Sequence, residues 1–253
     1  MSSRPGPIWR ASKITLQTWE ISYHLKRTRR RRSIALRVEP SGAVTVLAPR
    51  FALSHFVERF VQSQAGWIKK KLIDIEELRK KHPPKEFVSG EMFSVWGQEY
   101  PLHVVSDAAA VSSRCEWVDG RLQIRLKESD GLQARGAVKD LLCEWYARQT
   151  EGQLKESVPA LASAMGVSAR QVKVAEQRKR WGSCSRTGNL RFNWRLSMMP
   201  RPILDYVIIH ELAHIKAHNH SKAFWDIVRL ALPDFKERRT WLRKNGSAAT
   251  RWD

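Results

Sequence analysis

Cysteine is scarce in this 253-residue chain, which has only Cys115, Cys143 and Cys184. A small, odd number of cysteines cannot build the disulfide framework that stabilises many small secreted domains. A chain of this length can bury a sizeable core without covalent cross-links. We therefore expect a protein with an ordinary hydrophobic core in a reducing compartment.

Long apolar runs are also absent. No segment is apolar for long enough to span a bilayer. The first ten residues, MSSRPGPIWR, lack the apolar stretch of a secretory signal peptide. We expect a cytoplasmic protein with no membrane span.

Acidic residues are few relative to basic ones. The chain has 25 Asp and Glu against 45 Lys and Arg, so its formal net charge is +20 at pH 7. A solvated basic surface is the simplest interpretation, but such an excess is also compatible with nucleic acid, an anionic membrane surface or acidic substrates as partners. The densest basic stretches are Arg27 with Arg29–Arg32 and Arg178–Arg180, and Trp9, Trp19 and Trp181 lie near them in the sequence. Arginine neutralises phosphate and tryptophan stacks on bases, so sequence-independent, salt-sensitive nucleic-acid binding is one expectation.

The first half of the chain indicates a small α+β module. Residues 1–20 show no clear period and are expected to form a loose arm. Two alternating runs within residues 34–48 flank a Pro-Ser-Gly turn and predict a β-hairpin. Residues 52–82 have helical spacing, and short strands follow between residues 93 and 126, the last two joined by a turn at Asp119-Gly120. We therefore expect a β-rich module with a helix over residues 21–128.

The second half indicates a more helical domain over residues 129–253. Residues 132–165 predict a long helix that Pro159 could interrupt, and residues 190–196 alternate as a strand. Residues 203–217 predict a helix that is apolar nearly all round, and a last helical stretch is expected from Lys222 to about Lys244.

The apolar helix carries a motif with a chemical meaning, His210-Glu211-Leu212-Ala213-His214. Residues four apart share one helix face, so both imidazoles can reach the same metal ion. Glu211 is next to the first histidine and is placed to act as a general base towards water. On an apolar helix these polar groups would be costly to bury unless they were paired or bound to a metal. We prefer a metal site to a pair of core histidines.

A third ligand is needed, and half of the chain's eight histidines are concentrated in this segment. His218 would lie about 12 Å along a straight helix from His210, too far to complete the same site unless the helix breaks. His220 follows an asparagine, a residue that tolerates the left-handed conformation that ends helices. We favour His220, with His218 or a carboxylate such as Asp226 or Glu237 as alternatives.

Three protein ligands would leave a fourth position for water, which is typical of catalytic rather than structural zinc. We therefore expect one zinc ion per chain that activates water as a nucleophile. The negative charge that develops on the substrate would need a donor besides the metal. Arg180, Tyr206 and His218 are the candidates.

Several motifs together resemble the YgjP-like metallopeptidase family, a bacterial branch related to the SprT and Wss1 proteases. They are His210-Glu211-Leu212-Ala213-His214, Asn219-His220-Ser221, Phe224-Trp225, Arg180-Trp181-Gly182-Ser183-Cys184-Ser185 and Asn193-Trp194-Arg195-Leu196. The predicted hairpin, the segment Trp67–Lys70 and the strands near residue 90 also resemble the N-terminal part of that family, with less specific motifs.

The resemblance implies zinc held by His210, His214 and His220, with Glu211 as the base. It also implies a gluzincin-like helix pair beside a small sheet, which we expect to be antiparallel. The histidine spacing matches the metzincin pattern too, but Ala217 stands where that pattern has glycine, so we do not expect a metzincin. Because the SprT and Wss1 proteases act on DNA-bound proteins, the resemblance raises the possibility of a nucleic-acid-associated protease.

The segment before the helix suggests a substrate-binding strand. An edge strand beside the metal can pair with an extended substrate backbone, and Gly182 and Ser183 would allow close approach. The alternative is a tight turn around a buried Trp181, and the two are compatible. For Cys184 we expect a small buried residue, in preference to a fourth ligand or a redox sensor.

The sequence therefore predicts a zinc-dependent metalloendopeptidase acting on a peptide or protein substrate. Two other functions remain open at this point. One is a zinc-dependent hydrolase of nucleotide phosphoanhydrides, in which the same activated water attacks phosphorus. The other is a nucleic-acid-binding protein with a structural metal, which an open metal position beside Glu211 disfavours.

Overall fold

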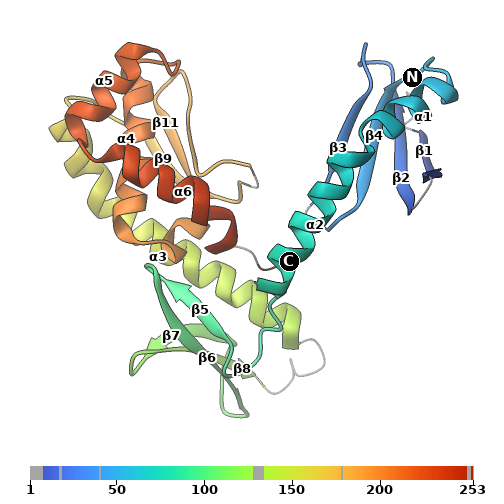
Figure 1. Cartoon of the computed structure of the whole chain (residues 1–253). Coiled ribbons are helices and arrows are strands. Elements are labelled where there is room, and N and C mark those ends of the chain that lie inside the picture. Colours follow the sequence, from blue (N-terminus) through green and yellow to red (C-terminus); the bar gives the residue numbers. More distant parts are fainter. Residues whose placement is uncertain are drawn as a thin grey trace, which may run out of the picture. The chain divides into compact units, whose positions relative to one another are not determined.

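A computed structural model describes residues 8–16, 19–39, 41–81, 83–127, 134–177, 179–249 and 252 (Figure 1). The chain divides into two compact units between Pro84 and Lys85. The boundary expected between residues 128 and 129 therefore lies inside the second unit. No boundary forms at that position because a long helix, described below, takes part in two hydrophobic cores.

The first unit contains a four-stranded sheet in the order β1-β2-β4-β3. Its strands are β1 (Ile8–Leu16), β2 (Trp19–Thr28), β3 (Ala35–Val38) and β4 (Val44–Pro49). The predicted hairpin corresponds to β3 and β4, which pair antiparallel. The loose arm expected over residues 1–20 is wrong for residues 8–16, because β1 pairs along its whole length with β2. Residues 1–7 lie outside the described part.

Two helices pack against this sheet, α1 (Ser54–Ser63) and α2 (Ala65–Lys81). The single helix predicted over residues 52–82 is thus interrupted at Gln64, whose N–H bonds to carbonyls of the last turn of α1. Val57, Val61 and Ile68 bury their side chains against the strands. The basic stretch Arg29–Arg32 lies in the connection between β2 and β3.

The second unit begins with another four-stranded sheet, in the order β5-β6-β8-β7. Its strands are β5 (Met92–Val95), β6 (Gln98–Asp107), β7 (Arg114–Val118) and β8 (Arg121–Lys127). The predicted turn at Asp119 and Gly120 joins β7 to β8, and both residues have positive φ, as a two-residue hairpin loop requires. The helix α3 (Ala134–Ala164) packs against this sheet through Val138, Leu142 and Trp145.

The helix α3 continues beyond that sheet and takes part in a second core. Its C-terminal half buries Leu154, Val158 and Ala162 against the elements that carry the histidines. Its 31 residues form one helix about 46 Å long, which Pro159 does not interrupt. Figure 1 shows α3 running along both parts of the second unit. Because one helix is shared by two cores, no domain boundary forms before it.

A small three-stranded sheet, in the order β10-β11-β9, belongs to the second core. Its strands are β9 (Gln171–Ala175), β10 (Gly182–Cys184) and β11 (Asn189–Asn193). The expected antiparallel sheet is mixed, because β11 pairs antiparallel with β10 but parallel with β9. The strand predicted through residue 196 ends at Asn193, whose side chain accepts a hydrogen bond from Arg195 N and starts the 3-10 helix η2 (Trp194–Met198).

Three helices complete the second unit: α4 (Arg201–Lys216), α5 (Lys222–Ala231) and α6 (Phe235–Ala249). Most of α4 is buried, including Ile208, Ile209 and Leu212. The β5–β6 turn supports the start of α4, since Trp96 N donates to Ser197 O at 2.7 Å just before the helix. None of the helices in the described ranges is both long and apolar enough to cross a membrane.

Candidate metal centre

Three histidines converge at the C-terminal end of α4. His210 and His214 project from the helix, which ends at Ala217 in an extended conformation (φ −139°, ψ 103°). The chain then turns back, and His220 Nε2 lies 3.1 Å from His210 Nε2. The candidate ligand atoms of His210, His214 and His220 all lie within 4.8 Å of one another.

One pair of this cluster has the spacing of two ligands of a tetrahedral zinc ion. Two nitrogens bound to zinc at 2.0–2.1 Å are separated by about 3.3 Å in a tetrahedron, close to the His210–His220 separation. His214 Nδ1 lies 3.0 Å from the carbonyl oxygen of Ala217, and a proton on that nitrogen leaves Nε2 free to bind a metal. Burial, with the neighbouring His214 and His220, lowers the pKa of His210 to about 3, so its ring is neutral at pH 7, as a ligand must be.

Aromatic side chains of α5 hold the histidine rings in place. Phe224 is fully buried, and its ring centroid lies 4.9, 4.5 and 4.8 Å from those of His210, His214 and His220. Trp225 stacks on His220, with 5.7 Å between centroids and 23° between planes. His220 is exposed, and the Trp225 ring covers one face of its imidazole.

Glu211 lies on α4 beside these ligands and is only 5% exposed. Burial raises the pKa of its carboxyl to about 7, against a smaller lowering by the charge of Arg180. The carboxylate occupies space next to Gly182 of β10, where a Cβ atom would come within 2.6 Å of Glu211 Oε1. Only glycine at this position leaves room for the carboxyl group as it stands.

The other residues singled out from the sequence line the same cavity, which has a volume of about 480 Å³. They are Arg180, Gly182, Ser183, Tyr206 and His218. The Tyr206 ring is buried, its centroid lies 6.0 Å from that of His210, and burial raises the pKa of its hydroxyl. Because β10 is an edge strand of its sheet, Gly182 and Ser183 border the cavity from a sheet edge.

The alternative third ligands lie outside the histidine cluster. His218 is exposed and lines the cavity without joining the cluster. Asp226 forms an ion pair with Arg229 at 3.2 Å, and Glu237 is exposed on α6. Within the described part of the chain, the structure groups His220, and neither of these carboxylates, with His210 and His214.

Cys184 also lines the cavity but is not part of the ligand cluster. Its thiol lies 3.3 Å from the carbonyl oxygen of Ser185, and burial raises its pKa. Trp181 is half-buried beside it. Both residues lie in the segment that contains the short strand β10.

Arg239 of α6 lies near the site but was not predicted from the sequence. Its guanidinium lies 4.6 Å from the centroid of the Trp225 ring. Nothing in the spacing of α6 links it to the histidines. The only sequence signal was Phe224-Trp225, which enters the resemblance but was given no role.

Comparison with known proteins gives one family. A family model described as YgjP-like, metallopeptidase domain, matches residues 32–245, a range that includes the three histidines and Glu211. No curated protein matches the chain. Among solved structures, the chain is similar to the crystal structure of the metallopeptidase zymogen of Pyrococcus abyssi abylysin. That likeness has 22% identity over 36% of this chain and 93% of that chain, with a TM-score of 0.33.

Proposed function

The chain belongs to the YgjP-like metallopeptidase family, and from this premise we propose that it is a zinc-dependent endopeptidase with Glu211 as its general base. The observation that carries the proposal is the convergence of three histidine nitrogens within 4.8 Å of one another beside the buried Glu211 carboxyl. Three imidazoles that converge in this way suit zinc, and a carboxyl next to them suits proton transfer.

His210, His214 and His220 would hold the zinc ion. When bound, zinc supplies a Lewis acid that makes water nucleophilic at neutral pH and polarises the scissile carbonyl group. Three protein ligands leave a position open for chemistry. We expect one ion per chain.

Glu211 would move the proton of the reaction. Its carboxylate accepts a proton from the attacking water as the water oxygen bonds to the carbonyl carbon. The protonated carboxyl then gives the proton to the departing amine nitrogen as the C–N bond breaks. Burial raises the pKa of this carboxyl, which makes the carboxylate a stronger base towards water.

The remaining residues of the cavity would bind the substrate and its developing charge. Tyr206 keeps its hydroxyl proton because burial raises its pKa, so it can donate a hydrogen bond to the carbonyl oxygen. Arg180 and His218 line the same cavity and are the other candidate donors. The edge of β10 at Gly182 and Ser183 offers backbone groups to an extended peptide.

The test is product mapping by mass spectrometry. The zinc-loaded protein is incubated with a mixed pool of peptides and, in parallel, with nucleoside triphosphates, and Glu211→Gln is the matched control. We expect new peptide ends that the variant does not produce. Intact peptides together with released phosphate or pyrophosphate would overturn the proposal in favour of phosphoanhydride hydrolysis.

A further inference from the structure

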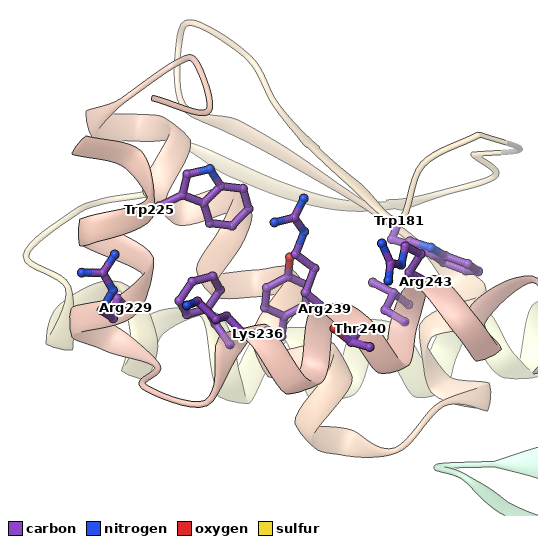
Figure 2. Close-up of a pocket in the computed structure, with 10 residues that line it drawn as sticks. Trp181, Trp225, Arg229, Lys236, Arg239, Thr240 and Arg243 are labelled. Atoms are coloured by element: carbon purple, nitrogen blue, oxygen red, sulfur yellow. The ribbon is translucent and has the colours of Figure 1, made fainter. Parts of the chain in front are cut away.

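A second and larger cavity, of about 720 Å³, adjoins the metal centre (Figure 2). Its walls come from α4, α5, α6 and the segment just before β10. Trp181, Tyr206 and Leu242 line both this cavity and the one that contains the histidines. The two cavities are therefore adjacent.

The second cavity is strongly basic. Arg229 of α5 and Lys236, Arg239 and Arg243 of α6 line it, and none of its lining residues is acidic. Arg229 is paired with Asp226. Among the described residues, no carboxylate lies within 4.0 Å of the charged groups of Lys236, Arg239 or Arg243. We call these three side chains, with Arg229, the basic pocket.

The three cations of α6 lie on one face of that helix, since they are spaced at i, i+3 and i+7. The row from Lys236 to Arg243 is about 10 Å long at the rise of an α-helix. An extended peptide covers about the same distance with three residues. Like charges along one helix face repel one another, so an anionic chain laid along the row would relieve that repulsion.

Trp225 connects the basic pocket to the metal centre. Its ring stacks on His220, and the guanidinium of Arg239 lies 4.6 Å from the centroid of the same ring. In the view of Figure 2, Arg239 extends between Trp225 and Trp181, with Arg243 beside Trp181. One aromatic ring, that of Trp225, therefore contacts both the guanidinium of Arg239 and the proposed zinc ligand His220.

We propose that the basic pocket is a specificity subsite for an acidic segment of the peptide substrate, with two or three Asp or Glu residues next to the scissile bond. This inference rests on the proposed peptidase function and adds the class of substrate. A single carboxylate would leave most of the row without a counter-ion, whereas a short acidic segment matches both its length and its charge.

Cleavage specificity tests the inference. Zinc-loaded wild type is given a library in which acidic residues are varied on either side of the cut, together with a neutral reference peptide. We expect acidic residues to be enriched on one side of the cut. In the triple variant Lys236→Ala, Arg239→Ala, Arg243→Ala, the ratio of kcat/KM for acidic over neutral peptide should fall at least tenfold.

A matched control separates the subsite from overall charge. The triple variant Arg121→Ala, Lys127→Ala, Lys173→Ala removes the same charge from exposed positions outside the basic pocket and should keep the wild-type ratio. Cleavage of the neutral peptide without any acidic preference would overturn the subsite and leave the peptidase proposal standing. Cleavage of no peptide at all would contradict the peptidase proposal.

Binding gives a readout that does not depend on turnover. The Glu211→Gln protein is titrated with a labelled acidic peptide and with a neutral peptide of the same length, and anisotropy is measured. We expect the acidic peptide to bind at least tenfold more tightly, with an advantage that falls with salt and is lost in the basic-pocket triple variant. Tighter binding of duplex DNA or inorganic triphosphate, lost in the same variant, would overturn the assignment to acidic peptides.

Discussion

Glu211 Oε1 of α4 lies where a methyl group built on Gly182 would be only 2.6 Å away, so the helix and the edge strand β10 fit together only because residue 182 has no side chain. Ordinary contacts to a Cβ atom are well beyond 3 Å, so the two positions cannot vary independently. The contact joins the group that would move the proton to the strand that would bind the substrate backbone.

Gly182→Ala is therefore expected to displace the Glu211 carboxyl without unfolding the protein, because the atoms in the way belong to a flexible side chain. The value of kcat/KM for peptide cleavage should fall at least tenfold, while zinc content stays at one per chain. Gly152→Ala is the control, since nothing lies within 4 Å of its Cβ position, and it should stabilise α3 by about 0.5–1 kcal/mol. A Gly182→Ala enzyme with the wild-type rate would show that the observed position of Glu211 is not the working one.

Glu211→Gln preserves the size of the side chain and removes its ability to accept a proton. We expect kcat to fall by about 10²–10⁴-fold, the usual contribution of a general base. Zinc should remain bound, because the carboxyl is not part of the ligand cluster. Elemental analysis and a peptide cleavage assay on the same preparation measure both quantities, and loss of zinc together with activity would make Glu211 a ligand instead.

His220→Ala should remove a zinc ligand, whereas His218→Ala should not. The first variant is expected to lose zinc on dialysis against a mild chelator that leaves the wild type loaded. The second changes an exposed histidine two residues away and is the matched control for chelation. Equal zinc retention by both variants would mean that another group completes the site.

Tyr146→Phe tests the core that joins α3 to the first sheet of the second unit. The Tyr146 hydroxyl is buried and donates to the carbonyl oxygen of Ser94 at 2.8 Å. Its removal leaves that carbonyl unsatisfied, which should lower the free energy of unfolding by about 1–3 kcal/mol. Urea denaturation followed by tryptophan fluorescence measures the change. Zinc content and kcat/KM should be unchanged, because the residue lies outside both cavities.

Residues 85–252 are expected to fold without residues 1–84, because both hydrophobic cores of the second compact unit consist of its own residues. The fragment should bind one zinc ion and unfold cooperatively. A fragment cut at residue 129, the boundary expected from the sequence, should not, since it loses the sheet against which α3 packs. Soluble expression, circular dichroism and zinc content distinguish the two fragments.

Local patterns predicted the elements whose signals are local. The helix predicted over residues 203–217 corresponds to α4, and the turn at Asp119 and Gly120 joins β7 to β8. β1 was not predicted because apolar and polar residues do not alternate regularly along its sequence. The strand is instead defined by its backbone pairing with β2. The domain boundary was misplaced because the two roles of α3 depend on packing at both of its ends.

One part of the candidate site could likewise be predicted from local sequence, and another part could not. The motif on α4 and the choice of His220 follow from helix geometry and from a residue that can end a helix. The basic pocket does not, because Trp181, Trp225 and Arg239 come from three separate segments that only the fold brings together. The sequence showed an excess of positive charge, but the folded chain is needed to show which cations share a cavity.

The turn between β5 and β6 has a consequence for how this protein can vary. Gly97 has a positive φ and is exposed, yet a Cβ atom there would come within 2.7 Å of Pro200, the residue that precedes α4. A surface loop is usually a place where a chain tolerates insertions and substitutions. Here such a change would be transmitted to the start of the helix that bears the histidines. We expect random mutagenesis under selection for activity to retain Gly97 as strictly as a core position.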